Sequence, residues 1–403
     1  FNYFMENLKN KKILLIICGG IAAYKSLELI RLFKKSGSMV KTILTNNAKK
    51  FVTPLSVVSL SQEKVYSNLF DLENESEMDH ISLSRWADII LIAPATANTI
   101  SKIANGYADD LASTVVLASN KKIFLAPAMN VRMWENSSNK KNINKLIDFN
   151  YKIIGPEKGD MACGEYGEGK MTEPREMINN LNRYFQNLSN NSKFTALVTA
   201  GPTHEYIDPV RYITNRSSGK QGYEIARCLQ ESGIKTTLIT GPTNLRPVEG
   251  VDIIKVKSAE EMFKKTLENL PSDIGIFSAA VSDWRVKNYK NIKIKKDENI
   301  NLEFERNIDI LNHVSNHNSL RPKIVIGFSA ETNNILKNSK AKIEQKNCDW
   351  IIANDVSNDA IGFESDLNEV TIFYKGKDSE KFPRMKKSLL AKKIVEKVIS
   401  QLN

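Results

Sequence analysis

The chain has 403 residues, 41% hydrophobic and 26% charged, which is ordinary for a soluble globular protein and more than one hydrophobic core usually holds. Its net charge is +11, but the basic residues are spread out and are not interleaved with aromatic residues. This pattern disfavours a nucleic-acid binder, and the charge is explained either by an enzyme that handles phosphorylated, anionic substrates or simply by a Lys/Asn-rich proteome. No apolar run approaches the ~20 residues that cross a bilayer, so no membrane span is expected. The four cysteines lie far apart without a CxxC pair, which indicates a reducing compartment, the cytoplasm, and no disulfide framework or zinc site.

The first half opens with a predicted strand (13–17), a glycine turn at Gly19 and Gly20, a helix over 21–36 and a second strand (40–44). Ala23, Leu27, Ile30 and Phe33 would form the apolar stripe of this helix. The turn is not GxGxxG, and the second strand leads into Thr45 without an acidic residue. The pattern therefore favours a mononucleotide such as FMN over a dinucleotide, although a tight turn of any α/β domain would look the same.

The next strands end in polar turns, which places candidate ligand groups at one edge of a parallel sheet. A continuous apolar run over 88–93 predicts a buried strand, and hydroxyl and amide groups follow it over 94–99. Thr96 in this turn could equally be a helix N-cap. Further strands are expected over 122–126 and 151–154, and a helix over 174–185 closes the first domain.

Three residues of the first half could carry chemistry, each beside an ordinary structural alternative. His80, expected just before a helix, could be a structural histidine. Asn130 could be a helix N-cap. Cys163 lies among glycines over 158–171, where we expect an accessible, mobile loop without helix or strand, but it could be an unreactive thiol.

Taken together, these segments resemble a known family. GGIAAYK (19–25), PATANT (94–99), PAMN (127–130) and ACGEYGEGKM (162–171) are similar to the flavin-dependent cysteine decarboxylases, specifically phosphopantothenoylcysteine decarboxylase. The resemblance implies a flavodoxin-like flavoprotein domain in which His80 is the base near the substrate thiol, Asn130 binds the carboxylate and Cys163 donates a proton. It also implies that FMN is bound by Gly19, Gly20, Thr45, Pro94, Thr96, Asn98 and Thr99.

A polar stretch over 186–193 reads as a short flexible connector, so we expect domains at 1–190 and 191–403. In the second half, strands are predicted over 195–200, 235–240, 273–280, 324–328 and 349–355, with a long loop over 204–215. A helix begins near Gly219 and Lys220, which would form a sensible anion site. Alternation predicts a hairpin of 292–296 with 301–305, another hairpin after residue 370, and a final helix that buries Leu390, Ile394, Val398 and Leu402.

The motifs of this half, ITNRSSGKQG (213–222), AAVSDW (279–284), KIKK (293–296), GFSAET (327–332) and ANDVS (353–357), resemble bacterial phosphopantothenate–cysteine ligase. The resemblance implies a Rossmann-like domain with an added hairpin, CTP as co-substrate, and Mg²⁺ near Asp283 and the CTP phosphates. It implies that Lys293 stabilises charge at the α-phosphate and that Asn215, with Arg211 nearby, holds an acyl-cytidylate. The implied CTP contacts are Ser278, Ala279, Ala280, Asp283, Lys293, Asn307, Ile308, Asp309, Ile310, Phe328, Lys342 and Lys346.

A chain in which a decarboxylase-like half is followed by a ligase-like half resembles the bifunctional enzymes of coenzyme A biosynthesis. That resemblance implies 4′-phosphopantothenate, L-cysteine, CTP and 4′-phosphopantothenoylcysteine as small-molecule partners, and a homo-oligomer, a dodecamer with dimeric ligase domains. An NAD(P) oxidoreductase would need the missing glycine fingerprint and ribose-binding acid. For the first half alone, an FMN-binding prenyltransferase, a peptide-cysteine decarboxylase and a non-enzymatic regulatory subunit remain alternatives.

Overall fold

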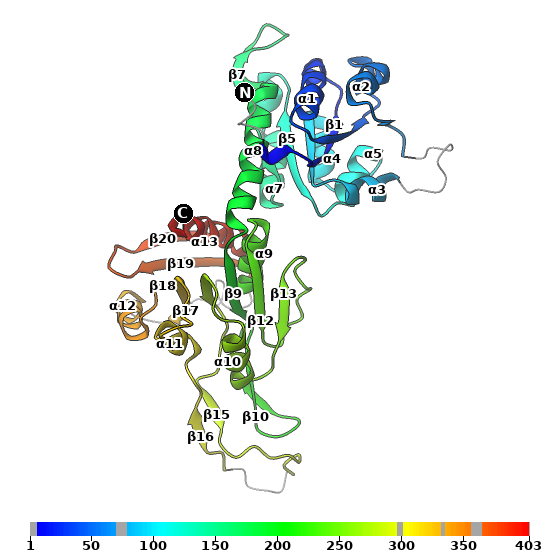
Figure 1. Cartoon of the computed structure of the whole chain (residues 1–403). Coiled ribbons are helices and arrows are strands. Elements are labelled where there is room, and N and C mark those ends of the chain that lie inside the picture. The colour runs from blue at the N-terminus through cyan, green and yellow to red at the C-terminus, as the bar shows by residue number, and fades with distance from the viewer. Residues whose placement is uncertain (1–5, 70–78, 296–300, 332–334, 356–364, 403) are drawn as a thin grey trace. The chain divides into compact units, whose positions relative to one another are not determined.

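The computed structural model describes residues 6–69, 79–295, 301–331, 335–355 and 365–402. The chain forms two compact units, Phe1–Gln186 and Asn187–Asn403 (Figure 1). Each is a mostly parallel sheet between helices, which confirms the predicted α/β class. Some positions of the predicted motifs, Lys296, Thr332 and 356–357, lie outside the described residues. None of the described helices is both long and apolar enough to cross a membrane.

Unit 1 is built on a six-stranded parallel sheet in the order β3-β2-β1-β4-β5-β6. The order reverses between β1 and β4, and open α/β sheets bind ligands beyond the carboxyl ends of the strands at such a point. The turns after β1, β4 and β5 are the predicted motif segments. The strands are β1 (Lys12–Ile17), β2 (Met39–Leu44), β3 (Val65–Tyr66), β4 (Ile89–Ala95), β5 (Lys122–Pro127) and β6 (Lys152–Ile153).

Helices cover both faces of this sheet because its strands are apolar on both sides. Alternate residues of β1 show this: Leu14 and Ile16 join the core beneath α3, α4, α5 and α7, and Leu15, on the other face, is fully buried as well. In helix α1, Leu29 is buried, whereas Leu27, which was predicted to belong to the apolar stripe, is only half-buried. The helical segments are η3 (Ile21–Ala23), α1 (Tyr24–Lys35), α2 (Pro54–Ser61), α3 (Asp79–Trp86), α4 (Ala97–Ala104), α5 (Leu111–Leu117), α6 (Val131–Glu135), α7 (Ser137–Asp148) and α8 (Pro174–Asn191).

Two expectations for the end of unit 1 are wrong. The glycine-rich stretch is not a loop without strands, because β7 (Glu157–Asp160) and β8 (Tyr166–Lys170) pair as an antiparallel hairpin. Its glycines do not prevent pairing, and Gly167 and Gly169 permit a close approach of β8 to residues 129–131. The expected flexible connector is also absent in its first part, since α8 continues to Asn191. Asn191 is buried and donates from Nδ2 to the carbonyl of Ser232, 3.0 Å away, which helps to order this end of the helix.

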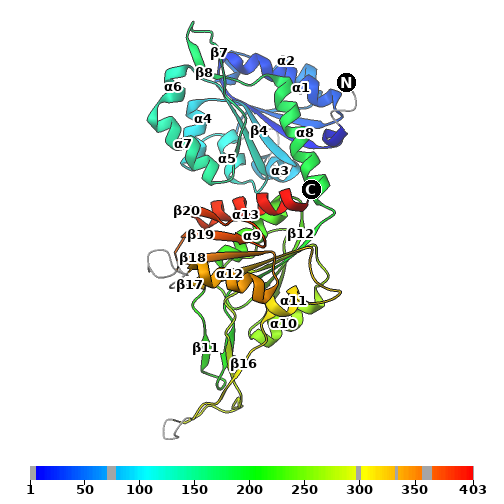
Figure 2. The same ribbon diagram turned by 90° about the vertical axis from the view of Figure 1, so that its left-hand side faces the viewer.

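Unit 2 contains an eight-stranded sheet in the order β13-β12-β9-β14-β17-β18-β19-β20, parallel up to β18 and closed by the predicted antiparallel pair β19 and β20. Helices α9 and α13 cover one face, and α10, α11 and α12 cover the other (Figure 2). The strands are β9 (Thr195–Ala200), β12 (Lys235–Thr240), β13 (Asp252–Lys255), β14 (Ile274–Phe277), β17 (Ile324–Glu331), β18 (Trp350–Asp355), β19 (Leu367–Tyr374) and β20 (Glu380–Lys386). The helices are α9 (Lys220–Glu231), α10 (Ala259–Glu268), α11 (Ile310–Ser315), α12 (Ile335–Lys346) and α13 (Lys387–Leu402).

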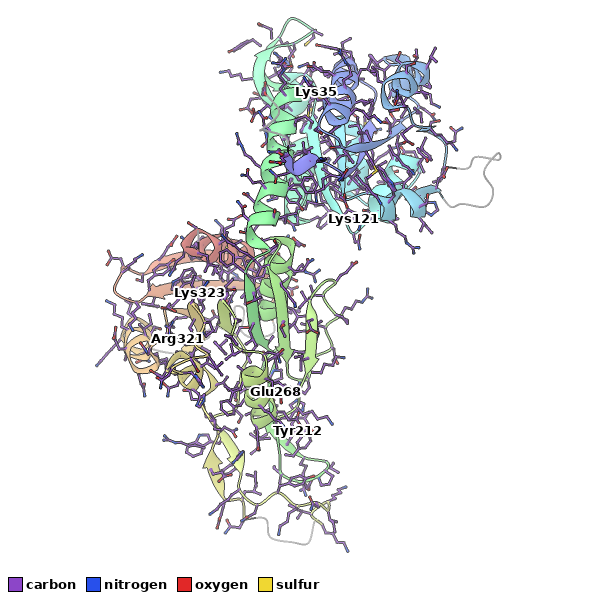
Figure 3. All side chains as sticks on the ribbon, in the orientation of Figure 1. Lys35, Lys121, Tyr212, Glu268, Arg321 and Lys323 are labelled. Carbon is purple, nitrogen blue, oxygen red and sulfur yellow. The ribbon has the colours of Figure 1, made fainter. Side chains whose placement is uncertain are left out.

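An arm of two short hairpins extends from this sheet. The expected long loop over 204–215 contains the paired strands β10 (His204–Tyr206) and β11 (Tyr212–Thr214), on which the rings of His204 and Tyr212 stack at 3.8 Å. Figure 3 labels Tyr212 on this arm. The lysine-rich segment does not pair as predicted: β16 (Phe304–Arg306) pairs with β15 (Trp284–Val286) and not with residues 292–295. The alternation of polar and apolar residues predicted strands over 292–296 and 301–305, but the pairing partner of a strand depends on the tertiary fold.

Candidate functional site

The turn after β1 leaves room for a ligand at the carboxyl edge of the unit 1 sheet. A Cβ at Gly19 would lie 2.4 Å from the Cβ of Asn47, so glycine is needed for this turn to pack on the turn after β2. At Gly20 an added Cβ would meet only Cγ2 of Thr96, at 3.9 Å, which means that the space in front of it is open. Gly20 brings no side-chain cap to η3, so the first amides of η3 are available to an anion. This glycine cradle fits the phosphate of a mononucleotide.

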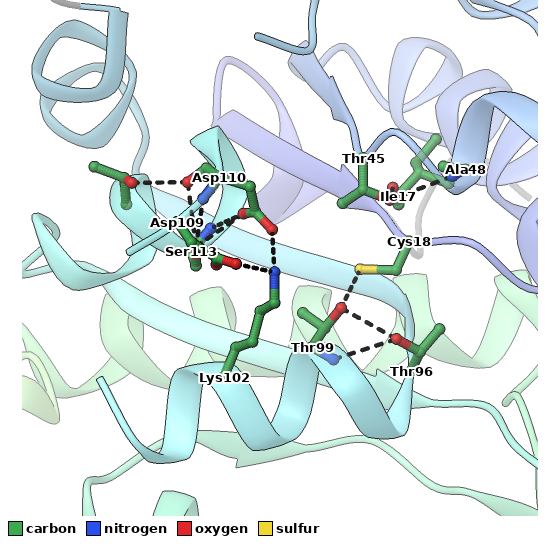
Figure 4. Close-up of polar contacts among 11 residues, drawn as sticks. Ile17, Cys18, Thr45, Ala48, Thr96, Thr99, Lys102, Asp109, Asp110 and Ser113 are labelled. Carbon is green, nitrogen blue, oxygen red and sulfur yellow. Dashed lines mark hydrogen bonds and ion pairs between the residues drawn. The ribbon is translucent and has the colours of Figure 1, made fainter. Parts of the chain in front are cut away.

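Hydroxyl groups gather beside the cradle (Figure 4). Thr96 is the N-cap of α4 and accepts from the amide of Thr99 at 3.3 Å, while Oγ1 of Thr99 donates to Sγ of Cys18 at 3.3 Å. Oγ1 of Thr45 donates to the carbonyl of Ile17 at 3.3 Å and accepts from an amide of its own turn. Burial raises the pKa of Cys18 to about 11, so this thiol stays neutral near pH 7.

The remaining predicted cofactor positions lie in the same region. Pro94 is buried near the end of β4, and Asn98 is exposed in the first turn of α4. Below them, Lys102 forms ion pairs with Asp109 at 2.8 Å and Asp110 at 3.0 Å, which tie α4 to the N-cap of α5. The predicted residues therefore surround the ends of β1, β2 and β4.

Asn130 lies after β5 and is fixed by the helix that it starts. Its Oδ1 accepts from the amide of Met133 at 2.9 Å, so the cap occupies the oxygen and leaves the Nδ2 group as a donor. The N-cap alternative and a carboxylate-binding role are therefore compatible.

The β7–β8 hairpin is anchored on the Asn130 segment. The amide of Met129 donates to the carbonyl of Gly169 at 3.0 Å, and a Cβ at Gly169 would lie 2.3 Å from the Met129 carbonyl oxygen. Nε1 of Trp134 donates to Glu168 at 2.9 Å. The base of the hairpin is thus held firmly beside Asn130.

The tip of the hairpin carries Cys163, which is exposed as predicted. Its nearest polar partner is Glu165, with 3.8 Å between Sγ and Oε2, and Glu165 also faces Arg132 at 3.5 Å. His80 lies in the first turn of α3 and not before the helix, and it is half-buried. Among the described residues no hydrogen bond or ion pair joins His80 or the Cys163 thiol to Asn130.

Unit 2 has a cavity of about 610 Å³ at the carboxyl edge of its sheet, where the strand order reverses between β9 and β14. Both faces of the sheet contribute, since α11 and α12 lie on one side and α9 and α13 on the other. The cavity brings together most of the predicted ligase residues: Asn215, Ser278, Ala279, Ala280, Asp283, Asn307, Ile308, Asp309, Ile310, Phe328, Lys342 and Lys346.

Hydrogen bonds fix two amide side chains of this cavity. Nδ2 of Asn215 donates to the carbonyl of Val281 at 2.9 Å, and Nδ2 of Asn307 donates to that of Ser282 at 2.9 Å. Their oxygens are left to accept from a ligand. On α12, Lys346 forms an ion pair with Asp309 at 3.1 Å.

Arg211 and Lys293 do not line the cavity. The buried carboxylate of Asp208 accepts from Nε of Arg211 at 2.9 Å and from the amide of Ile294 at 3.2 Å. Arg211 in turn donates to the carbonyl of Ile294 at 3.0 Å, and its guanidinium holds the pKa of Asp208 well below the ordinary value. Asp208 therefore joins Arg211 to the exposed segment that carries Lys293.

The cavity also has a wall that the sequence did not indicate. Asn368 and Lys387 line it, and no motif pointed to either residue. Lys220 and Asn354 line the same wall; Gly219 and Lys220 were predicted as an anion site at the start of a helix, whereas Asn354 lies in the ANDVS motif without a predicted role. Their common location depends on the order of β18, β19 and α13, which only the fold defines.

The chain is closely similar to proteins of known family over nearly all of its length. The coenzyme A biosynthesis bifunctional protein CoaBC of Borreliella burgdorferi is 43% identical over 392 residues, which cover 96% of this chain and 99% of the relative. CoaBC of Haemophilus influenzae is 42% identical over 396 residues, 98% of each chain. This chain belongs to the CoaBC family. It is therefore a bifunctional enzyme of coenzyme A biosynthesis, with phosphopantothenoylcysteine decarboxylase and phosphopantothenate–cysteine ligase activities.

Each half of this CoaBC protein also matches a family of its own. Residues 4–186 match the family described as Flavoprotein, and residues 192–402 match the DNA/pantothenate metabolism flavoprotein C-terminal domain. The crystal structure of the C-terminal domain of a CoaBC is 34% identical with a TM-score of 0.44, and covers 53% of this chain and 98% of that one. The FMN binding protein AtHal3 is 33% identical with a TM-score of 0.38, and covers 44% of this chain and 97% of that one.

Proposed function

We propose that unit 2 makes 4′-phosphopantothenoylcysteine through an acyl-cytidylate formed in its cavity. A carboxylate oxygen of 4′-phosphopantothenate attacks the α-phosphorus of CTP and pyrophosphate leaves. The amine of L-cysteine then attacks the acyl carbon, loses a proton and displaces CMP. The observation that carries this proposal is that twelve predicted ligase positions, contributed by separate parts of the chain, line one cavity.

The cavity residues have the donors and acceptors that this reaction needs. Asn215, with its Nδ2 held by the Val281 carbonyl, presents Oδ1 toward the reacting groups. Lys342 and Lys346 supply positive charge for the nucleotide, and the ring of Phe328 offers an apolar surface for the base.

A Mg²⁺ ion fits the carboxylate of Asp283, which lines the cavity and makes no ion pair among the described residues. No group of three or more His, Cys, Asp or Glu side chains gathers in the described part of the chain. The ion would accordingly take most of its ligands from CTP phosphates and water, as Mg²⁺ commonly does. Asp283 would hold it against the phosphates.

Lys293 would stabilise charge at the α-phosphate, with Arg211 beside it, although neither lines the cavity of its own chain. This separation supports the proposal that the protein works as a homo-oligomer with dimeric ligase units, in which the arm can reach a second copy. Exposed Ile21, Tyr24 and Leu55 of unit 1 are consistent with a further interface and with a dodecamer. Four free cysteines and the family's pathway support the cytoplasm as its location.

Unit 1 would bind FMN at the glycine cradle and the threonines around it. The fit rests on the open space at Gly20, the uncapped amides of η3 and the hydroxyl groups of Thr96 and Thr99. FMN, when bound, supplies the oxidation of the substrate thiol that makes loss of CO₂ possible, and the return of the electrons afterwards.

The side chains of unit 1 would orient the substrate and move protons. His80 would accept the proton of the substrate thiol, and the free Nδ2 group of Asn130 would hold the α-carboxylate. Cys163 would give a proton to the enethiolate left by decarboxylation. Its place at the tip of an anchored hairpin would let the thiol approach the substrate while the base stays fixed.

One assay tests both halves. Purified protein is incubated with CTP, 4′-phosphopantothenate, L-cysteine and Mg²⁺, and products are followed by mass. We expect pyrophosphate, CMP, CO₂ and 4′-phosphopantetheine, and a flavin absorbance near ~450 nm. Protein that remains flavin-free after incubation with FMN would contradict the cofactor, and activity with ATP but not with CTP would contradict the nucleotide.

A further inference from the structure

The stretch of the arm that carries Lys293 has little packing to hold it. We call residues 288–295 the Lys293 segment; they follow β15 and form no helix or strand. Their side chains are exposed except that of Ile294, which is half-buried. In the described part of unit 2, the buried clusters on the two faces of the sheet contain none of these residues. The position of the segment therefore depends on its hydrogen bonds.

The Lys293 segment is held at Ile294, the residue directly after Lys293. The amide of Ile294 donates to Oδ2 of Asp208 at 3.2 Å, and Nη2 of Arg211 donates to the Ile294 carbonyl at 3.0 Å. One pair of side chains thus binds both backbone polar groups of one residue. Among the described residues, the only other hydrogen bond from this segment to another part of the chain is 3.2 Å long. It runs from the amide of Lys290 to the carbonyl of the residue before Asp208.

Asp208 is a rigid point of attachment. Its side chain is fully buried, and Oδ1 accepts from the amides of Val210 at 2.8 Å and Arg211 at 2.9 Å. Oδ2 accepts from Nε and Nη2 of Arg211 at 2.9 Å and 2.5 Å. A buried carboxylate is tolerated when it is paired and fully hydrogen-bonded, and these bonds meet that need within one turn of the arm. The Arg211 guanidinium holds the pKa of Asp208 well below its usual range, so the carboxylate is charged at neutral pH.

The Asp208–Arg211 pair is directed at the backbone and not at the cavity. Among the described residues that line the cavity, neither member of the pair is present. Nε and Nη2 of Arg211 are used on Asp208 and Ile294, which leaves the Nη1 group as its remaining donor. Because the pair holds the residue next to Lys293, any change in the pair moves the point from which Lys293 extends.

We infer that Asp208 is a positioning residue for the first step of ligation, in which it fixes the backbone from which Lys293 approaches the α-phosphate of CTP. The inference rests on the proposed function, which gives Lys293 the charge that develops at that phosphate. Asp208 contacts no reacting group itself and acts through Lys293. The attachment lies within one arm, so the same reasoning holds whether Lys293 serves the cavity of its own copy or of a second copy.

The first experiment tests whether Asp208 holds the segment. Asp208→Asn keeps the shape of the side chain and an oxygen for the turn, but places an N–H group against the donors of Arg211 and Ile294. In the full-length variant, trypsin should cleave after the lysines of 288–295 about tenfold faster than in the wild type, because local opening exposes them. Thermal unfolding and decarboxylation in unit 1 should stay unchanged, which shows that the variant is folded.

Glu303→Gln is the matched control for a lost carboxylate on the same arm. The side chain of Glu303 is 65% exposed and lies 3.9 Å from Nζ of Lys287, so this ion pair contributes little. Glu303→Gln should leave both the cleavage rate and the ligase rates at the wild-type level.

The second experiment separates the two steps of ligation. Pyrophosphate release is measured with CTP and 4′-phosphopantothenate in the absence of cysteine, and the second step is measured by adding cysteine to acyl-cytidylate that has already formed. Asp208→Asn should lower the first rate about 10- to 100-fold, since misplacing a catalytic group by about 1 Å can cost about 100-fold, and should keep the second within about twofold. An equal loss in both steps would indicate a general structural role and overturn the inference.

A double-mutant cycle with Lys293→Met identifies the path of the effect. If Asp208 acts through Lys293, Asp208→Asn should change pyrophosphate release by less than about twofold in the Lys293→Met background. Losses that multiply would show independent action and overturn the inference. Wild-type cleavage and a wild-type first step in Asp208→Asn would also overturn it. If Asp208→Asn does not fold, Ile294→Pro, which lacks the amide donor to Asp208, replaces it in the cycle.

Failure of the proposed function has a different signature. Wild type that releases no pyrophosphate from CTP would refute the proposed ligase reaction, while the trypsin experiment still tests whether Asp208 holds the segment. Release of pyrophosphate that is undiminished in Lys293→Met would refute the role of Lys293 and the inference together.

Discussion

The contact between the Cys163 hairpin and the Asn130 segment can be broken by one methyl group. At Gly169 the backbone has φ +142°, and an added Cβ would lie 2.3 Å from the carbonyl oxygen of Met129 and 2.8 Å from Cε of Met161. The Met129 carbonyl is backbone and cannot rotate away as a side chain would. Gly169→Ala should therefore push the hairpin off the segment that holds Asn130.

The magnitude follows from two contributions. A non-glycine residue in a sparsely populated backbone region costs about 1–3 kcal/mol. Overpacking by a methyl group typically costs about 1–3 kcal/mol more. Gly106→Ala is the matched control, because Gly106 has φ +73° and nothing lies within 4 Å of its added Cβ, so only the backbone cost remains.

Hydrogen exchange and decarboxylation measure the effect. In Gly169→Ala the Met129 amide, which donates to the Gly169 carbonyl, should exchange faster, as should amides of 157–170. Release of CO₂ should fall at least tenfold, whereas ligation in unit 2 should be unchanged. The Gly106→Ala protein should keep the exchange pattern of the hairpin and the decarboxylase rate. Wild-type exchange and CO₂ release in Gly169→Ala would refute the anchoring role.

Four further predictions address single side chains. Cys163→Ser should abolish formation of 4′-phosphopantetheine but retain part of the CO₂ release; wild-type product formation would exclude Cys163 as the proton donor. Asn215→Asp should release pyrophosphate and accumulate acyl-cytidylate, detected by mass, whereas normal ligation would contradict its proposed role. Iodoacetamide at pH 8 should modify exposed Cys163 well before buried Cys18 and Cys348, whose pKa values burial raises to about 11; peptide mapping would show the opposite order if the hairpin tip were protected. Lys25 lowers the pKa of Glu173 through a 2.7 Å hydrogen bond, so the carboxylate stabilises the fold above its ordinary pKa and the stabilisation is lost as pH falls through the lowered pKa. Urea denaturation should accordingly show Glu173→Gln less stable than wild type at pH 7, with the difference shrinking as the pH falls through the lowered pKa of Glu173; a constant difference would contradict the linkage.

Local sequence was sufficient for the parallel strands other than β3 and β13, which were not predicted, and for the polar turns that follow β1, β4 and β5. Residues 195–200 and 235–240 became β9 and β12 at the predicted bounds, because a β-branched apolar run between glycine turns has few alternatives. Thr96 and Asn130 are N-caps for an equally local reason. The final helix buries Leu390, Ile394 and Val398 as its periodicity predicted, but Leu402, predicted with them, is only partly buried at the end of the helix.

Tertiary contacts determine which strands pair, and they determine the secondary structure of the glycine-rich and polar segments that were predicted to be flexible. Residues 304–306 pair with residues 284–286 and not with the alternating segment at 292–295. The alternation of polar and apolar residues predicts a strand but does not identify its partner. The glycine-rich stretch around Cys163 forms a hairpin because its base is anchored on Met129 and Trp134. The polar residues after 186 continue α8, whose end packs into unit 2 through Asn191.

The sequence by itself predicted the two α/β units, the family and twelve of the residues that line the unit 2 cavity, because these are encoded in short contiguous motifs. Only the tertiary structure revealed Asp208 as the link between Arg211 and the Lys293 segment, and the place of Asn368 and Lys387 in the wall of the unit 2 cavity. These residues carry no local signal, since an aspartate in a turn, an asparagine in a strand and a lysine at a helix start are ordinary alone. Their surroundings in the fold distinguish them: the Asp208 carboxylate accepts five hydrogen bonds, and the buried amide of Asn368 has no hydrogen-bond partner for its oxygen or its nitrogen.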